Sequence, residues 1–546
     1  MKENLILNLK RRFDSCQSEA NVPRSVLDEL EKYVVPYRGR MFQKHSGEGS
    51  VEWDKYDHYD DTAVVSAQIL SASIHGAILP PVKWFDLKFK NEDLQNDDEA
   101  SEWLADTSRR VYGAIDNSNF DLEADEMILD LTGFGHGFMV SEAGGLDEEE
   151  LSFDMIPIKE MFFEEGAIGA KFRRLEWTPT KIVSKFGIDN VPKEVKDKYD
   201  NPNTTSSMKM EVIFAIFYRK DKKDADTTKP LIATERPWGH IYFLYDGMEQ
   251  IGDEGGYYED PVYSVRWRTV SGSQWGHGPG HIALGDIKQL NQHRLMRTRA
   301  VEKVIDPANI TTQRGLIGNL DLGPRGLTIV RNIDDLKPYE SGANFAVSRE
   351  ELELLRNSIR QAFLVDQLEL KQSPTMTATE VQVRYELMNR LLGPTAGRMK
   401  VDWLNKVVEN VFRIELRAGR LLEMPESLKN VSLDINIEYI GALATAQKSQ
   451  LSNEMINWAG DVANLSQAYP NMKYVVNAEE LVRAVGRLKN IPEKAINGTT
   501  EVEKLKREEA DIIAKRQQLE EAKAEGDAME AQGKGQQALR AVNENG

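Results

Sequence analysis

An acidic cluster near the N-terminus is the densest group of side chains that could carry chemistry. Its members are Asp57, His58, Asp60 and Asp61. Asp57 and Asp61 are four residues apart, so they would share one face of a helix and could hold a divalent cation, as in a metal-dependent nuclease. The alternative is a solvated helix start, where carboxylates interact favourably with the helix dipole. We favour the helix start, because metal chemistry would need further ligands that the sequence does not locate.

The glycine-rich segment 133–137 (GFGHG) could be read as a phosphate-binding loop. It lacks the G-x-G-x-x-G spacing, and no acidic residue follows where a dinucleotide ribose would need one. The sequence also contains no G-x-x-x-x-G-K-[ST] motif, so it does not support ATP hydrolysis by a P-loop. We therefore predict a structural turn at 133–137 and no cofactor.

His277 and His281 have the four-residue spacing that zinc sites use on helices. A Gly-Pro-Gly segment lies between them, so a regular helix cannot place both rings on one face. No third ligand is evident, and we predict a loop. Cys16, the single cysteine, lies in a polar stretch without a nearby base, so we do not expect a nucleophile there.

The composition is that of a globular chain with an acidic surface. Of 546 residues, 40% are hydrophobic and 29% are charged, and the formal net charge is -19. A chain of this length should contain several packed units. Nonspecific DNA binding needs clustered Lys and Arg, so the charge argues against a DNA-wrapping protein but is compatible with a low-affinity conduit. We expect no disulfide, no signal peptide and no membrane span.

Hydrophobic periodicity predicts helices in the first quarter of the chain and strands after it. Helices are expected at 62–79 and 99–115. Strands are expected between 136 and 270, where 211–218 is a nearly continuous apolar run. Alternating residues before Asp246-Gly247 indicate a hairpin.

The second half of the sequence predicts two helices, 281–305 and 348–370, around a small α/β insertion. A capping box at Thr377 begins a long helix that Gly393-Pro394 must break or kink. The cleanly alternating segment 431–440 is the clearest half-buried strand. A charged helix at 500–525 and a disordered tail are expected after it.

Five short motifs follow one another along almost the whole chain, from about Arg11 to Ala522. They are WDKYDHYDDTA at 53–63, SASIHGAILPP at 71–81 with Trp84-Phe85, WGHGPG at 275–280, TATE at 377–380, and YIG at 439–441 continuing to Gln447. In this order they resemble the head-to-tail connector, or portal protein, family of short-tailed bacteriophages.

The resemblance implies an α+β, helix-rich portal fold with wing, stem, clip and crown regions. These would be a wing at 1–280 and 372–440, stem helices at 281–305 and 348–371, a clip at 306–347, a crown at 441–525 and a disordered tail at 526–546. It also implies a ring, which family members build from twelve copies around a DNA channel.

The stem helices fit a ring on physical grounds as well. A helix with two apolar faces can pack on its partner and on a neighbouring subunit, although burial in a monomeric core explains the periodicity equally well. The expected oligomer contacts are Leu284, Ile287, Leu352, Leu355, Ile359 and Phe363.

In the family, a loop beside a kinked wing helix projects into the channel, and the break at Gly393-Pro394 is expected to form it. Its residues would be Leu392, Gly393, Pro394, Thr395, Ala396, Gly397 and Arg398. Arg390, Arg398 and Lys400 would lie near DNA. The alternative is an ordinary corner between two helices.

We therefore expect a non-enzymatic subunit of a dodecameric portal ring that carries double-stranded DNA during packaging and ejection. Expected partners are further copies of the chain, the packaging terminase, the major capsid protein and tail adaptor proteins. The ring would assemble in the host cytoplasm and occupy one capsid vertex of the virion. The alternatives are a tail or scaffold component and, less favoured, a metal-dependent nuclease that uses Asp57 and Asp61.

Overall fold

A computed structural model describes most of the chain. The described residues are 2–38, 58–91, 94, 97–143, 151–166, 168–201, 209–222, 231–311, 316, 329–332, 336–338, 345–368, 392–428, 435–440, 442–469, 476–489, 502 and 504–516. Two compact units divide the chain. Unit 1 is Met1–Leu87, Ala105–Glu423 and Asn436–Gly441, and unit 2 is Lys88–Leu104, Met424–Ile435 and Ala442–Gly546. None of the helices in the described ranges has the length and apolar character that crossing a membrane requires.

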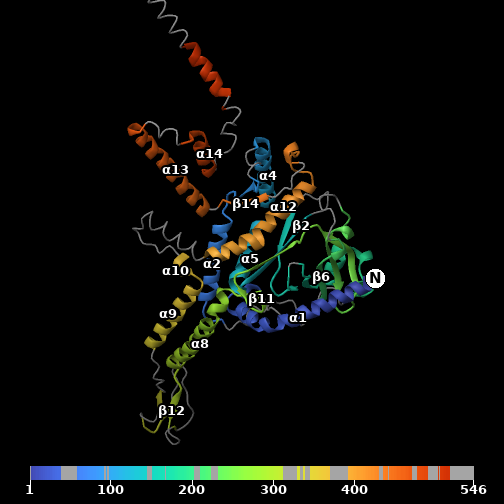
Figure 1. Ribbon diagram of the computed structural model, residues 1–546. Helices are drawn as coiled ribbons and strands as arrows, with labels where there is room; N and C mark the ends of the chain where they lie inside the picture. Colours follow the sequence, from blue (N-terminus) through green and yellow to red (C-terminus); the bar gives the residue numbers. More distant parts are fainter. Residues whose placement is uncertain are drawn as a thin grey trace, which may run out of the picture. The chain divides into compact units, whose positions relative to one another are not determined.

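A five-stranded antiparallel sheet and the long N-terminal helix α1 (Lys2–Tyr33) form one core of unit 1 (Figure 1). The strands, in spatial order, are β4 (Met161–Phe163), β5 (Lys171–Trp177), β6 (Met210–Tyr218), β7 (Trp238–Leu244) and β8 (Gln250–Tyr257). Phe13 of α1 packs edge-on against Phe162 and Phe172, with ring centroids 5.1 and 5.7 Å apart. The predicted strand at 211–218 is confirmed as β6, and the predicted hairpin at Asp246-Gly247 joins β7 to β8.

A second sheet of unit 1 contains β3, β2 and β9 in that order. Their bounds are Leu151–Met155, His136–Ala143 and Val262–Arg266, and a short ladder pairs β10 (Thr269–Val270) with β11 (Ser273–Gly276). Two helices inside the predicted strand region, α6 (Pro179–Phe186) and α7 (Lys193–Asp200), were not predicted. The start of α6 carried a readable signal, because Thr178 accepts a hydrogen bond from the Lys181 backbone N–H and a proline follows it.

Three further helices match or extend the predicted helical first quarter. They are α2 (Thr62–Ile78), α4 (Asp98–Asp116) and α5 (Phe120–Phe134), and the predictions at 62–79 and 99–115 are confirmed. The structural turn predicted at 133–137 is also confirmed, because α5 ends there and β2 begins. Gly135 closes α5 with φ +75°, and a Cβ at this position would lie 2.3 Å from the backbone N of Gly278, so only glycine fits.

The paired helices α8 (Pro279–Ile305) and α9 (Phe345–Ala362) pack against each other and extend together from the body of unit 1 (Figure 1). The first confirms the helix predicted at 281–305. The second is shorter than predicted, because Leu364 takes φ +59° and separates α9 from α10 (Val365–Leu368). Beyond the pair, β12 (Asn309–Thr311) runs antiparallel to β13 (Leu336–Pro338). The described part of the predicted α/β insertion is therefore strand.

The channel loop predicted at 392–398 is wrong in conformation. Residues 392–399 are helical and continue through a π-helical turn, Lys400–Leu404, into α12 (Asn405–Arg417). Pro394 lies within this helical segment. The irregularity lies six residues later than predicted, at the π-turn. The first part of the helix predicted from Thr377, up to residue 391, lies outside the described residues, and α12 confirms its later part.

The strand β1 (Phe85–Phe89) pairs with β14 (Ile435–Tyr439), which confirms the described part of the strand predicted at 431–440. Unit 2 contains α13 (Ala442–Ala468), α14 (Ala478–Leu488) and the helical segment 504–516. It also includes Lys88–Leu104 and Met424–Ile435, which the sequence placed in the wing. The wing, stem, clip and crown boundaries remain predictions, and the tail at 526–546 lies outside the described residues. Short 3-10 turns occur at Pro36–Arg38, Ile188–Asn190, Lys220–Lys222, Ala233–Glu235 and Glu426–Leu428.

Candidate functional site: an ion-pair junction at the paired helices

The described part of the acidic cluster forms the start of α2. Asp60 lies two residues before the helix, and its Oδ1 accepts hydrogen bonds from the Thr62 backbone N–H at 3.1 Å and from the Thr62 hydroxyl at 2.5 Å. An acceptor here satisfies one of the N–H groups that helix geometry leaves without a partner. The predicted helix start is confirmed, and Asp60 acts as its capping side chain.

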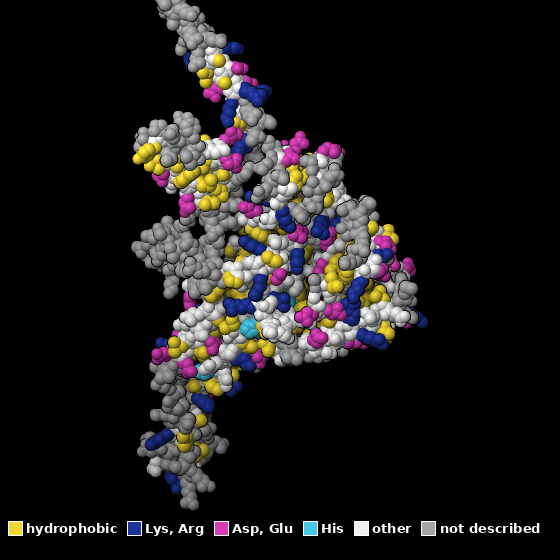
Figure 2. Space-filling view, viewed as in Figure 1, with side chains coloured by type: hydrophobic (Ala, Val, Ile, Leu, Met, Phe, Trp, Pro, Cys, Tyr) yellow, Lys and Arg dark blue, Asp and Glu magenta, His cyan; other side chains and the backbone are white. Residues whose placement is uncertain are grey.

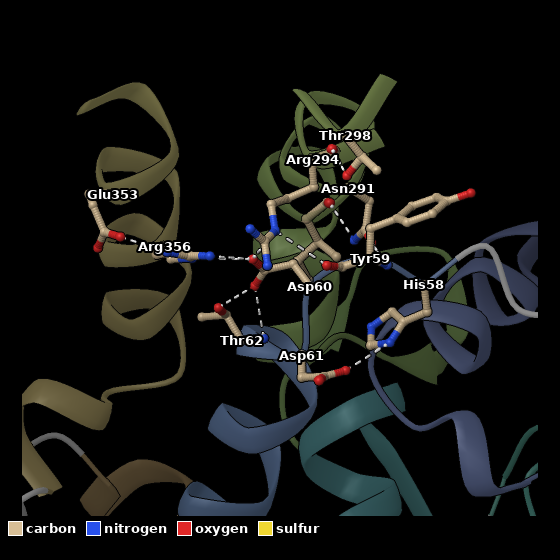
Figure 3. A network of polar contacts seen from close by, with 11 residues as sticks. His58, Tyr59, Asp60, Asp61, Thr62, Asn291, Arg294, Thr298, Glu353 and Arg356 are labelled. Carbon is tan, nitrogen blue, oxygen red and sulfur yellow. Dashed lines mark hydrogen bonds and ion pairs between the residues drawn. The ribbon is translucent and has the colours of Figure 1, made fainter. Parts of the chain in front are cut away.

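Asp60 also connects the body of unit 1 to both paired helices (Figure 3). Its side chain is only 4% exposed, and its Oδ2 accepts hydrogen bonds from Arg356 Nη2 at 2.8 Å and Nε at 3.2 Å. Arg294 Nε lies 3.4 Å from the same oxygen. Because Arg294 belongs to α8 and Arg356 to α9, one carboxylate is paired with both helices.

The backbone beside Asp60 is held by the same helices. Asn291 of α8 is buried, and its Oδ1 accepts a hydrogen bond from the Tyr59 backbone N–H at 2.8 Å. Its Nδ2 donates to the Ile287 carbonyl at 3.0 Å, so its amide group is held on both sides. The segment before α2 is therefore fixed to α8 through main chain and side chain together.

The electrostatics of the junction favour an ionised Asp60. Burial on its own would raise the pKa of this carboxyl, because desolvation disfavours charge. Hydrogen bonds from Thr62 and Arg356 outweigh that effect and hold the pKa below its usual value. Glu353 lies 2.6 Å from Arg356 and balances part of the excess positive charge.

This geometry does not support a nuclease. Asp60 is already surrounded by guanidinium groups, which compete with a metal cation for the carboxylate. The side chain of Asp61 is 82% exposed and lies 3.1 Å from His58 Nδ1. Asp57 lies outside the described residues. Within the described ranges, no group of three or more His, Cys, Asp or Glu side chains is placed to hold a metal ion.

The other residues that could carry chemistry are packed into the fold. The rings of His277 and His281 stack with centroids 4.5 Å apart, and His281 Nδ1 accepts a hydrogen bond from the Gly278 N–H at the start of α8. The predicted loop at His277 is confirmed, while His281 lies in the first turn of the helix. Cys16 is buried, and burial raises its pKa to about 12, which makes it a poor nucleophile.

Four of the six predicted oligomer contacts face the interior of the single chain. Ile287, Leu352, Ile359 and Phe363 are buried within the chain, where they hold the hairpin and its neighbours together. Leu284 and Leu355 are partly exposed. The large apolar side chains that remain exposed on the pair include Ile282, Met296, Val301, Val304, Ile305 and Leu354.

Two of the residues expected near DNA have intramolecular contacts. Arg398 Nη1 donates to the Trp267 carbonyl at 2.9 Å. Lys400 Nζ lies 4.6 Å from the centre of the Tyr439 ring, and burial lowers its pKa. Both cations are thus engaged with the body of unit 1. Arg390 lies outside the described residues.

A pocket of about 490 Å³ opens between the two sheets of unit 1. Arg173 is paired there with Asp154 and Glu160, so much of its charge is balanced internally. Lys181 and Lys185 of α6 lie over the Trp177 ring at 5.0 and 5.3 Å. The described lining residues contain no histidine or cysteine. The pocket therefore offers paired charges and aromatic surface rather than a recognisable catalytic group.

Comparison with protein families gives a match over most of the chain. A family model described as "Bacteriophage head to tail connecting protein" matches residues 8–496. The chain belongs to this family. The resemblance stated from the sequence is confirmed, together with the helix-rich α+β portal fold and the function of a head-to-tail connecting, or portal, protein of a bacteriophage.

Two relatives of known name match this portal chain along most of their length. The portal protein of Salmonella phage epsilon15 is 24% identical over 482 residues, 86% of this chain and 84% of that protein. A probable portal protein of Bordetella phage BPP-1 is 23% identical over 524 residues, 92% and 91% of the two chains.

Weaker similarity links the portal chain to solved structures of gene transfer agent particles. One is the neck of an empty particle computed with C6 symmetry, with 9% identity and a TM-score of 0.35, covering 73% of this chain and 86% of that chain. Another is the neck of a native particle computed with C12 symmetry, with 10% identity and a TM-score of 0.33, covering 72% and 85%.

The sequence alone missed the two arginines of the junction. Asp60 was noticed as an acid near a helix start, but Arg356 is 296 residues away from it along the chain. No local spacing can join residues so far apart. No local pattern indicated that α8 and α9 lie beside the start of α2.

Proposed function

We propose that the chain is one subunit of a twelve-copy portal ring at a single vertex of a bacteriophage capsid. Double-stranded DNA would pass through the central channel during packaging and ejection. The observation that carries this proposal is the family match across residues 8–496, which includes most of both units. The lack of a P-loop motif in the sequence fits a passive conduit whose motor is a separate protein.

The paired helices supply a ring contact in this proposal. Ser358 donates a hydrogen bond to Asp286 at 2.5 Å, and His293 lies 3.7 Å from Glu351, so the two helices have a fixed register. In this register, the positions of Leu354 on α9 and Met296 on α8 differ by less than about two helical turns along the helix axes. Both side chains are exposed.

Rotational symmetry makes these two outer faces natural partners. Copies related by rotation about one axis meet head to tail, with different surfaces of the two subunits in contact at similar levels. Met296 and Arg299 of α8 are exposed, as are Glu350 and Leu354 of α9. Apolar groups and opposite charges would thus meet across the boundary between one copy and the next.

The remaining partners follow from the portal role. The packaging terminase and the tail adaptor proteins would bind the ring at different stages, and the major capsid protein would surround it after assembly in the host cytoplasm. The helical segment 392–398 stays our proposal for the part nearest to DNA, with Arg390 as the cation. Arg398 and Lys400 fit this role less well because unit 1 already binds them.

Negative-stain microscopy and native mass measurement of the purified full chain test the proposal directly. We expect rings with a central hole and a mass about twelve times the 61.9 kDa of one chain. A tagged chain should then label a single vertex of the phage particle. A tail or scaffold component would label another place or be absent from the mature particle, and a chain that stays monomeric when concentrated would contradict the ring.

A further inference from the structure

A line of large apolar side chains lies on the surface of α13 in unit 2. Leu451, Trp458 and Leu465 are 50%, 49% and 53% exposed. They follow one another at intervals of seven residues, which is nearly two helical turns, so they form a single stripe along the helix. Figure 2 shows hydrophobic side chains gathered along α13 and α14. We call these three residues the α13 stripe.

The packing of α13 on α14 leaves the stripe uncovered. Among the described side chains of α13, at 451–466, the less exposed ones are Ser452, Met455, Ala459, Val462 and Ser466; they are spaced three or four apart, so they share one face, which fits packing on α14. The stripe lies along one flank of that face. Because α14 has 11 residues and α13 has 27, the shorter helix cannot cover the whole apolar surface of the longer one.

The charge of α13 indicates what covers the stripe. Only Lys448, Glu454 and Asp461 are charged among its 27 residues, whereas 29% of the whole chain is charged. Identical chains with a net charge of -19 repel each other, so a contact between copies is favoured where charge is sparse. A seven-residue apolar repeat is also the pattern by which one helix packs against another.

We infer that the α13 stripe packs against unit 2 of a neighbouring copy of the same chain. This inference rests on the proposed ring, because it requires several copies held side by side. It adds a second contact between subunits, formed by unit 2, to the contact made by the paired helices. Trp458 would be its central anchor, since buried aromatic side chains contribute most to such contacts.

Thiol labelling of the assembled full chain tests the inference. Cys16 is buried, so an introduced surface cysteine is the reactive thiol. Leu465→Cys places the thiol on the stripe, and Asn464→Cys, its exposed neighbour in sequence, places one about 100° around the helix as a matched control. In rings, we expect a maleimide to react with Leu465→Cys at least about tenfold more slowly than with Asn464→Cys, because the contact must open locally before the thiol can react.

The same pair of variants is then labelled in dissociated chains, obtained with Leu354→Asp in the paired helices. There the two thiols should react at similar rates. Equal rates in rings would overturn the inference because the stripe would be free. Slow labelling of Leu465→Cys in both states would overturn it too, because the chain's own residues would cover the stripe. Absence of rings in the parent chain would instead refute the proposed function, and native mass shows this before any labelling.

Discussion

Asp60 is a buried carboxylate shared by arginines from two different helices. Such a pair adds little net stability, because the cost of desolvating charges offsets their attraction. Its geometric effect is stronger. Hydrogen bonds fix distance and direction, so they set how α8 and α9 leave the body of unit 1, whereas an apolar contact alone would allow sliding.

Replacing Asp60 with Asn should destabilise the chain by about 1–3 kcal/mol, because Arg356 loses its carboxylate partner while it stays largely buried. Arg356 keeps Glu353 as a partner, so the loss of stability should be smaller than the largest losses seen when a buried ion pair is broken. Urea unfolding measures the change. Asp61→Asn is the matched control, since that side chain is exposed, and it should change stability by less than about 0.5 kcal/mol. Equal effects of the two variants would contradict the importance of the junction.

Buried histidines make the folded chain sensitive to mild acid. Burial lowers the pKa of His136 to about 3 and of His240 and His281 to about 4. Unfolded histidine titrates near pH 6.5, so between about pH 6.5 and 4 the unfolded state binds protons that the folded state does not. The free energy of unfolding should therefore fall as pH falls through this range. Asp130, whose pKa burial raises to about 6, offsets part of the loss below that pH.

His136→Gln tests the contribution of one such group. As pH falls, the free energy of unfolding should decrease less steeply in the variant than in the parent chain. The difference in slope should be up to about 1.4 kcal/mol per pH unit, because the unfolded variant no longer takes up a proton at this position. Urea unfolding at several pH values between 4.5 and 7 measures the slope. Gln292→Asn, at an exposed position of α8 that does not titrate, should leave the slope unchanged. An unaltered slope in His136→Gln would show that this ring is not kept neutral by the fold.

At the scale of elements, the apolar residues of the paired helices fall into two groups: some are buried within the chain, and others are exposed and available for contact with another copy. Leu352 and Ile359 are buried in the chain, while Leu354 is 64% exposed on the opposite side of α9. The exposed leucine is not needed for the fold of the single chain. Its burial between copies would make the free energy of assembly more favourable. This division lets ring formation be disturbed without unfolding the subunit.

Leu354→Asp should therefore prevent or weaken ring formation while the subunit stays folded. The new carboxylate would be buried near Glu350 of its own helix and lose hydration in the contact. Native mass and circular dichroism measure assembly and fold. Asn357→Asp, an exposed position on the same helix, adds the same charge without removing an apolar group and should still form rings. Rings of full size in Leu354→Asp would place the contact elsewhere.

Local patterns predicted elements well and contacts poorly. The apolar run of β6, the turn signal at Asp246-Gly247 and the helix at 281–305 each depend on neighbours in sequence, and each was predicted. The oligomer contacts stay a prediction, because one periodic stripe explains internal and external burial equally well and Ile359 is buried within the chain. Gly393-Pro394 failed as a loop because the two residues lie within a described helical segment, and a local pattern of helix breakers does not show how the surrounding chain packs.

At the scale of the whole molecule, the net charge of -19 opposes the proposed assembly. Twelve like-charged chains in one ring repel each other, and the repulsion reaches further at low ionic strength. The screening length is about 30 Å at 0.01 M salt and about 10 Å at 0.1 M. Repulsion between neighbouring subunits should thus be strong in the first condition and weak in the second. The opposite charges proposed for the boundary, such as Arg299 and Glu350, would act over much shorter distances.

We therefore expect rings to be more stable at moderate salt than at low salt. At fixed protein concentration, sedimentation should show more free subunits at 0.01 M than at 0.15 M NaCl, because screening removes the long-range repulsion and spares apolar contacts. Arg299→Glu should steepen this dependence, since it adds two negative charges per copy at the boundary. If rings dissociate as salt rises, ion pairs between copies outweigh the net charge, and the sparse charge of α13 would lose its significance for assembly.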